Sequence, residues 1–421
     1  MSGLDGLIHA PELAVAAVAG RDPADVMVAA TGDVSSVAFS PDGALLVVPR
    51  EQSVEIVDLA SSDVLRVLGG HTGVVRGVAF SPDGALLATA SDDGTARLWD
   101  PATGQHRTTL QGHTDWVTAV AFSPDATLIA TTSTDRTARL WDLATGQHRT
   151  TLTGHTGRVT AAAFSPDSTL LATTSQDRTA RLWDLATGQH RTPLTGHTGP
   201  VRGVTFSSDG TLIATTSSDE TTRLWDLTTG QHRSTLKGHN DWVTAVAFSP
   251  DGALLATTSH DRTARLWNPA NGEHSITLTG HTGPVSGVAF SPDGALLATT
   301  SPDRTARLWN PANGEHSITL TGHTSRVTAV AFSLDGALLA TTSDDRTARL
   351  WDPSTGAWRA TLLALDAGGY AVLLPDGSYK LDGDPGRYLW WAIKLCRFGP
   401  GELDPYDPAI RRLPVDAPIP R

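Results

Sequence analysis

A histidine, a serine and an aspartate recur together along this chain of 421 residues. These are the three residue types of the catalytic triad in serine hydrolases, in which His and Asp activate the Ser nucleophile. The first set is His71, Ser91 and Asp93, and six further sets follow at steps of 42 residues. An active site rarely occurs in seven equivalent copies, and a tryptophan accompanies each set. We therefore interpret these residues as a folding element and expect no catalytic residue among them.

Other chemistry finds little support in the sequence. The single cysteine, Cys396, excludes an internal disulfide framework and any metal site built from several thiolates. Thirteen of the 15 histidines lie in Gly-His pairs or in the segments QHR and EHS, which the repetition spaces far apart. No glycine-rich loop opens a helix as a phosphate-binding loop does. We expect neither a metal nor a cofactor.

The charge balance argues against nucleic acid and membranes as partners. Lys and Arg number 32 against 44 Asp and Glu, so the net charge is −12 and no global basic field exists. Arginines recur near the repeated aspartates, where local pairing or a solvated face is favoured over a phosphate-binding ring. They are Arg97, Arg136, Arg139, Arg178, Arg262, Arg304 and Arg346. No apolar run is long enough to span a membrane, and Asp5 and Glu12 stand where a signal peptide needs basic residues, so we expect a soluble, cytoplasmic protein.

A repeat of constant length must position these residues. Gly-His opens each unit and a tryptophan followed by Asp or Asn recurs in each, always in steps of 42 residues, so seven units occupy residues 70–363. A degenerate copy occupies residues 28–69 in the same register. It has other residues in place of His, Ser, Asp and Trp, namely Ala29, Pro49, Glu51 and Val57.

Four short strands are expected in each unit. In the unit that begins at residue 112 they are predicted at 117–122, 128–133, 137–142 and 148–152, with turn residues between them. The fourth strand is the most polar, so each antiparallel sheet has buried inner strands and a wet outer edge. Copies of such a sheet bury their faces only against one another. We therefore predict an all-β, radially repeated and closed structure.

These residues resemble the WD-repeat (WD40-type) family of β-propellers over residues 28–363. The likeness rests on the period, Gly-His, the Ser-x-Asp-x-Thr segment and Trp-Asp, which agree seven times. It implies that the His, the second-strand Ser, the turn Asp and the Trp of each unit form a hydrogen-bonded tetrad. In this tetrad Asp would fix the His tautomer, and Ser would link His to the indole N–H. The implied tetrads are His71, Ser91, Asp93, Trp99; His113, Ser133, Asp135, Trp141; His155, Ser175, Asp177, Trp183; His197, Ser217, Asp219, Trp225; His239, Ser259, Asp261, Trp267; His281, Ser301, Asp303, Trp309; and His323, Ser343, Asp345, Trp351.

The seven units and the degenerate copy in series predict a ring of eight blades. Residues 370–377 resemble another first strand, 378–381 could form a second, and 24–28 could supply an outer strand. A nine-bladed ring closed by both termini is therefore an alternative, as is a seven-bladed ring with a separate flanking sheet. We divide the chain into an N-terminal segment (1–27), the degenerate blade (28–69), the seven repeats (70–363) and a C-terminal tail (364–421).

The tail breaks the period and carries Trp390, Trp391 and Cys396. We expect it to cap an exposed edge or face of the ring; a docking segment and an oligomerisation element are the alternatives. It resembles a segment that follows repeat arrays in actinobacterial proteins. The use of 29 Arg against three Lys also favours a bacterial source.

Variation among the repeats is concentrated at two positions, three residues after the His and one residue before the Asp. The resemblance implies that both emerge on the same rim of the ring. The first position holds Val74, Trp116, Arg158, Pro200, Trp242, Pro284 and Arg326. The second holds Asp92, Thr134, Gln176, Ser218, His260, Pro302 and Asp344. Trp and Arg are favoured anchors at interfaces, so Trp116, Arg158, Trp242 and Arg326 are predicted to line a face that binds a protein or peptide.

The sequence thus favours a non-catalytic interaction scaffold. By family analogy it would be the recognition module of a bacterial signalling or defence assembly. The alternative is a propeller enzyme, a hydrolase or lyase with its site in the central channel. Such a site needs groups found in only one or two blades, and His260 and Asp344 are the candidates. The sequence leaves the partner and the oligomeric state open.

Overall fold

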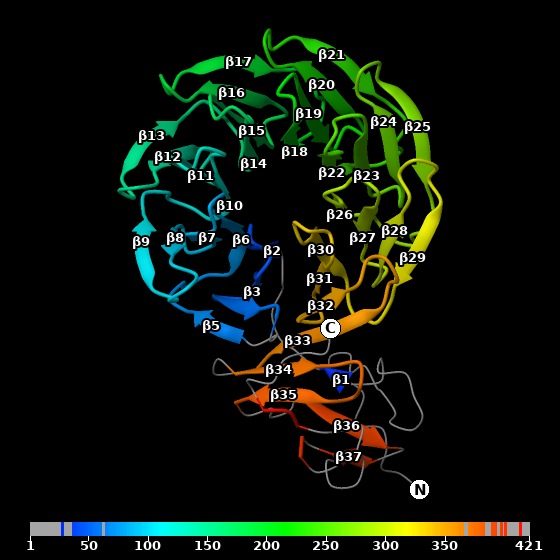
Figure 1. Ribbon diagram of the computed structural model, residues 1–421. Helices are drawn as coiled ribbons and strands as arrows, with labels where there is room; N and C mark the ends of the chain where they lie inside the picture. The colour runs from blue at the N-terminus through cyan, green and yellow to red at the C-terminus, as the bar shows by residue number, and fades with distance from the viewer. Residues whose placement is uncertain are drawn as a thin grey trace, which may run out of the picture.

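The computed structural model describes residues 27–28, 36–60, 64–365, 369–383, 389–393, 396–398, 400–401 and 412–414. These residues form strands, turns and loops (Figure 1). Eight antiparallel sheets, seven of four strands and one of six, stand around a common centre in chain order and are called blades 1 to 8 here. Blade 1 is β2–β5 and blade 8 begins at β30, so the described residues confirm the prediction of an all-β, eight-bladed propeller.

The first strand of each blade faces the centre of the ring, and the second lies behind it (Figure 1). The first strands are β2 (Ala38–Phe39), β6 (Val75–Phe80), β10 (Val117–Phe122), β14 (Val159–Phe164), β18 (Val201–Phe206), β22 (Val243–Phe248), β26 (Gly287–Phe290) and β30 (Val327–Phe332). The second strands are β3 (Leu45–Arg50), β7 (Leu87–Ser91), β11 (Leu128–Ser133), β15 (Leu170–Ser175), β19 (Leu212–Ser217), β23 (Leu255–Ser259), β27 (Leu297–Thr300) and β31 (Leu339–Ser343).

The third and fourth strands complete each antiparallel blade towards the outside. The third strands are β4 (Ser53–Asp58), β8 (Ala96–Trp99), β12 (Ala138–Asp142), β16 (Ala180–Asp184), β20 (Thr222–Asp226), β24 (Ala264–Asn268), β28 (Ala306–Trp309) and β32 (Thr347–Trp351). The fourth strands are β5 (Val64–Leu68), β9 (His106–Leu110), β13 (His148–Leu152), β17 (His190–Leu194), β21 (His232–Leu236), β25 (Glu273–Leu278), β29 (His316–Leu320) and β33 (Trp358–Ala364).

Burial follows this order of strands. The second strand of a central blade, such as β15, is buried at every residue because neighbouring blades cover both of its faces. Such strands read as continuous runs of Leu, Ile, Ala and Thr rather than as an alternation. Each structural indole fills the space between two blades: Trp183 packs on Leu140 and Leu152 of the preceding blade. The ring is therefore held together by apolar contacts between blades, since the hydrogen-bonded ladders lie within them.

The two alternatives to eight blades, a nine-bladed ring and a seven-bladed ring with a separate flanking sheet, are wrong. β34 (Tyr370–Leu373) and β35 (Tyr379–Asp382) are the strands expected at 370–377 and 378–381, but they pair onto β33 and make blade 8 six-stranded. β1 (Met27–Val28) pairs with β36 (Leu389–Ile393), which pairs with β37 (Cys396–Phe398), in a separate three-stranded sheet. Residues 24–26 lie outside the described residues. The described strands of the tail therefore extend blade 8 beyond its fourth strand or join the separate sheet, and none of them forms a further blade.

The ring closes where blade 1 meets blade 8, and among the described residues no indole belongs to the buried cluster at this interface. Val57 stands where the other third strands carry Trp, and it packs against Leu350 and Leu362 of blade 8. Tyr370 and Val372 of β34 belong to the same buried cluster, as does Leu374. Aromatic and aliphatic side chains of the tail therefore contribute the apolar volume at the one interface that lacks the tryptophan.

A buried ion pair adds a polar contact at the same interface. Arg50 lies next to Glu55 (Nε–Oε2 3.2 Å), and their side chains are only 8% and 3% exposed. The Arg50 guanidinium also donates to the backbone carbonyls of Arg346 and Leu362 in blade 8. Arg50 thus links the degenerate blade directly to the last blade, which a hydrophobic residue at this position could not do.

Leu374→Ala should destabilise the fold because it removes a 2%-exposed side chain from the closure cluster. We expect a loss of about 2–5 kcal/mol in the free energy of unfolding, measured by urea denaturation. The matched control is Leu334→Ala, whose side chain is 65% exposed and should change the stability by less than about 0.5 kcal/mol. Equal effects of the two substitutions would show that the tail does not close the ring.

Candidate functional site

A chain of hydrogen bonds runs through each of blades 2 to 8. In blade 4, Trp183 Nε1 donates to Thr173 Oγ1 (2.8 Å), and Thr173 Oγ1 lies 2.9 Å from His155 Nε2. His155 Nδ1 lies 2.8 Å from Asp177 Oδ2. The same three contacts measure 2.7–3.0 Å in the other six blades. Each chain therefore contains Asp, His, Thr and Trp.

The expected role of the serine as the link is wrong. Trp183 pairs with Leu171, so Thr173 is two residues further along the same face of β15, and Ser175 is four residues along. Four residues of strand span about 13 Å, which puts Ser175 out of reach of the indole. The linking residues are Thr89, Thr131, Thr173, Thr215, Thr257, Thr299 and Thr341. They recur every 42 residues, a signal that the sequence carried as clearly as it carried the serines.

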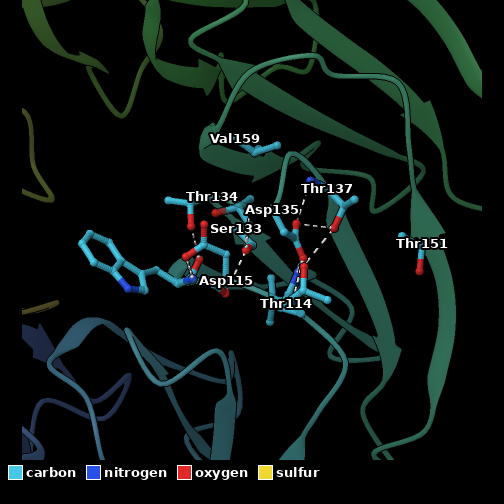
Figure 2. Close-up of polar contacts among 12 residues, drawn as sticks. Thr114, Asp115, Ser133, Thr134, Asp135, Thr137, Thr151 and Val159 are labelled. Carbon is cyan, nitrogen blue, oxygen red and sulfur yellow. Dashed lines mark hydrogen bonds and ion pairs between the residues drawn. The ribbon is translucent and has the colours of Figure 1, made fainter.

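Each serine holds the turn that carries the aspartate. Ser133 accepts a hydrogen bond from the backbone N of Asp135 (3.0 Å) and donates to the carbonyl of Asp115 (3.1 Å), as Figure 2 shows. The seven serines in question, from Ser91 to Ser343, all accept from the backbone of the following Asp. The serine thus positions the carboxylate through the backbone instead of through the imidazole.

The hydroxyl, imidazole and carboxylate follow one another as in a catalytic triad, but the hydroxyl is buried where no substrate can reach it. Thr173 is fully buried, and its oxygen already accepts the hydrogen bond from the Trp183 indole. A nucleophile must reach a substrate at bonding distance, which this hydroxyl cannot do. The geometry supports a structural role for all seven chains.

Burial and hydrogen bonding set the charge states of these groups. Burial lowers the pKa of His113 by more than its contact with Asp135 raises it. Burial would raise the pKa of Asp135, but hydrogen bonds from Thr137 and His113 outweigh that effect and lower it. Asp135 also accepts from the backbone N of Thr114 and Thr137 (Figure 2). A neutral imidazole that donates from Nδ1 to an ionised carboxylate then accepts the threonine hydrogen at Nε2.

The glycine before each of these histidines makes room for an arginine of the same blade. At Gly70, which has a φ of 137°, a Cβ would lie 2.6 Å from Nη1 of Arg97. The same close approach relates Gly112 to Arg139 and recurs in the other repeats. The third-strand arginines therefore pack into the scaffold. The turn arginines are different: Arg136, Arg178, Arg262, Arg304 and Arg346 all occupy the left-handed region, with φ between 69° and 73°.

The two variable positions of a blade lie close together, and a backbone hydrogen bond joins them in blades 2 to 6 and in blade 8. The backbone N of Thr134 donates to the carbonyl of Trp116 (3.0 Å), and that of His260 donates to the carbonyl of Trp242 (2.9 Å). Equivalent bonds join the variable residues of blades 2, 4, 5 and 8. In blade 7 the second variable residue is Pro302, which has no N–H to donate. The variable residues thus lie in pairs on one rim, which we call the loop rim.

The two tryptophans of the loop rim are about half exposed. Trp116 is 46% exposed and Trp242 is 44% exposed. In each case an arginine of the preceding blade lies over the ring, with Arg76 Cζ 5.9 Å from the Trp116 centroid and Arg202 Cζ 4.5 Å from the Trp242 centroid. These distances are within the range of cation–π attraction. Sequence reasoning missed both arginines, although they share the same offset of 40 residues from their tryptophans.

The two predicted arginines lie elsewhere on the loop rim. Arg158 is exposed in blade 4, next to the blade of Trp116. Arg326 belongs to blade 8, pairs with Asp344 and keeps a side chain that is 62% exposed. The four predicted residues therefore stand in blades 3, 4, 6 and 8 and do not form one pocket.

The described residues offer no group of three or more His, Cys, Asp or Glu side chains that could hold a metal ion. That part of the chain also contains no helix long and apolar enough to cross a membrane. Trp390, Trp391 and Cys396 fall on β36 and β37, where the backbone alone is described.

One protein-family model matches the chain, that of the WD domain, G-beta repeat. It matches residues 62–100, 104–142, 146–184, 188–226, 230–268, 272–310 and 314–352, well over half of the chain. Each matched segment begins just before the fourth strand of one blade and ends at or just after the last residue of the third strand of the next. The unit of the family model is therefore offset by one strand from the blade, and each matched segment spans parts of two neighbouring blades. No curated protein matches the chain.

Thr173→Val should test the hydroxyl link, because it leaves Trp183 Nε1 and His155 Nε2 buried without a partner. Each unpaired buried group costs about 1–3 kcal/mol, so we expect a loss of about 2–5 kcal/mol in the free energy of unfolding. Ser175→Ala is the control, and it should cost about 1 kcal/mol because it removes a turn contact only. A larger loss for the serine variant than for the threonine variant would reverse the assignment.

Acid should weaken the fold through the histidines. Burial lowers the pKa of four buried histidines, His71, His113, His155 and His323. The unfolded chain then binds more protons than the folded one below about pH 6.5, so the free energy of unfolding decreases as the pH falls through that value. Urea unfolding midpoints at pH 7.5, 6.5 and 5.5 measure this trend. A urea midpoint that rises as the pH falls to 5.5 would contradict the conclusion that the buried histidines are neutral.

Proposed function

Because the chain belongs to the WD40 repeat family, whose propellers generally serve as protein-interaction scaffolds, we propose that it is a non-catalytic scaffold that binds a protein or peptide on its loop rim. The setting we propose is that of a cytoplasmic recognition module in a bacterial signalling or defence assembly. That setting rests on the family analogy and the arginine-rich composition.

One observation carries the proposal, the exposure of two tryptophans on the same rim. Five large hydrophobic side chains are exposed among the described residues, and the only aromatic ones are Trp116 and Trp242. Indoles combine a large apolar area with an N–H donor and are enriched among the residues that dominate binding energy. A rigid blade holds each one, since the backbone bond to the second variable residue fixes its loop.

The spacing of the two indoles favours a partner that crosses the mouth of the ring. They stand three blades apart, which is about 135° around eight blades. This separation is too wide for one small pocket and suits an extended or bulky partner. Arg158 and Arg326 would add polar contacts to the same rim, where charged side chains set orientation more than affinity.

The alternative of an enzyme has less support. Its two candidate residues, His260 and Asp344, are in blades 6 and 8 and contact different partners. The His260 ring lies 5.2 Å from that of Trp242, whereas Asp344 pairs with Arg326. General acid–base catalysis needs groups that converge on one substrate, and these two do not converge.

The double variant Trp116→Ala plus Trp242→Ala should keep its fold, because neither residue belongs to a buried chain, and should lower partner capture at least tenfold. The measurement is affinity capture from the native host, read by mass spectrometry, beside thermal unfolding of the same variant. Two controls should leave capture unchanged: Gln105→Ala before an outer strand, and Leu334→Ala, an exposed hydrophobic residue in a turn at the other end of the strands. Wild-type yields from the double variant would refute the loop rim as the binding face.

A further inference from the structure

The loop rim contains the same arginine–tryptophan pair twice, three blades apart. Arg76 and Arg202 are each the second residue of an innermost strand, β6 and β18, and each lies over the tryptophan of the next blade. The equivalent position in the other five repeats carries a small hydroxyl residue. Those residues are Thr118, Thr160, Thr244, Ser286 and Thr328.

In the first pair, the arginine binds a carboxylate of the chain itself. Arg76 Nε lies 2.9 and 3.1 Å from the two oxygens of Asp92, and Arg76 Nη2 lies 2.5 Å from Asp92 Oδ2. This is the bidentate geometry in which a guanidinium binds a carboxylate most strongly. Blade 2 therefore shows which chemical group an arginine at this position accepts.

The second copy lacks that carboxylate. Ser218 stands where Asp92 stands in blade 2, and its hydroxyl accepts one bond from Arg202 Nε (2.7 Å). Among the described residues, no acidic side chain lies within ion-pair distance of Arg202, and its two terminal nitrogens make no hydrogen bond. Burial lowers the pKa of Arg202, as expected for a guanidinium that is partly withdrawn from water.

Two further groups complete the surroundings of Arg202. Trp242 lies beneath the guanidinium, and the ring of His260 lies 5.2 Å from the indole at an angle of 35°. An imidazole N–H is a donor that a second oxygen could use. The acidic residue that directly follows Ser218 is Asp219, whose carboxylate is already occupied by His197, Thr221 and the backbone of Thr198.

We propose that Arg202, Trp242 and His260 bind an acidic side chain, Asp or Glu, of the protein partner. The inference rests on the proposed interaction function and adds the chemistry of one contact to it. Arg202 is the second residue of β18, the innermost strand of blade 5 (Figure 1), so a partner that lies across the loop rim can place a carboxylate there. The chain carries a net charge of −12 and does not attract anions as a whole, so a local, partly desolvated cation is what selects the carboxylate.

The test uses the full-length protein and an acetylated, amidated hexaglutamate peptide, with hexaglutamine as the neutral probe. Binding is followed by nuclear magnetic resonance at the Trp242 indole N–H, assigned with Trp242→Phe. Hexaglutamate should shift this signal and hexaglutamine should not. Inorganic phosphate is titrated in parallel, and tighter binding of phosphate than of hexaglutamate would overturn the assignment to a carboxylate.

Two reciprocal variants make the test specific. Ser218→Asp supplies the carboxylate in cis, as blade 2 does, and should weaken hexaglutamate binding at least tenfold. Asp92→Ser should release Arg76 and make the Trp116 indole respond to the same peptide. Unchanged hexaglutamate affinity in the Ser218→Asp protein, with an unchanged melting temperature, would overturn the proposal.

The outcome can be separated from that of the proposed function. If hexaglutamate fails to bind while the tryptophan double variant loses its partner, the carboxylate site is refuted and the scaffold proposal stands. If hexaglutamate binds and Ser218→Asp blocks it, the carboxylate site stands whatever the double variant does. The melting temperatures of the tryptophan double variant and of the Ser218→Asp protein are measured as well, so that loss of fold is not mistaken for loss of binding.

Discussion

A threonine hydroxyl shared between an indole and an imidazole is the contact on which the ring depends. It anchors a tryptophan that would otherwise bury an unpaired N–H, and the anchored indole fills the space between two blades. The imidazole in turn reaches the aspartate that holds the turn after the second strand. Because one hydrogen-bonded chain connects the interior of a blade, its turn and its contact with the neighbouring blade, the same four residues recur in every regular repeat.

The degenerate blade shows what replaces that constraint when it is missing. Blade 1 has no indole, and its closure with blade 8 rests on aliphatic packing, on side chains of β34 and on the Arg50–Glu55 pair. A buried ion pair contributes little net stability, since desolvation offsets much of its attraction. Arg50 contacts two carbonyls of blade 8, so it adds direct polar contacts between the two blades. The tail is thus part of how the ring closes, because it supplies apolar volume at the position of the missing tryptophan.

The same scaffold leaves the loop rim free to vary. The two variable residues of a blade are joined through the backbone, so side chains can change without loosening the loops that carry them. This arrangement fixes the loops that carry Trp116 and Trp242 in the free protein, and such ordering reduces the entropy lost in the binding that we propose. Because the repeats are nearly identical, a residue that differs from its counterparts on the rim is easily recognised. Ser218, which occupies the position of Asp92, is such a residue and changes the chemistry of its blade.

The sequence by itself determined the repeat, the strands and the residues that vary, because period and polarity pattern depend on local chemistry that recurs every 42 residues. It also indicated eight blades. Only the tertiary structure decided that Thr173 and not Ser175 meets the indole, because that choice depends on strand register and on the few ångströms that an indole can reach. The structure alone placed Arg202 over Trp242 as well, since the two residues come from different blades and no local pattern joins them. The position of β34 depended on the same kind of information: its sequence suits a first strand or an outer one, and in the structure it pairs with β33 and packs in the same buried cluster as Val57 of blade 1.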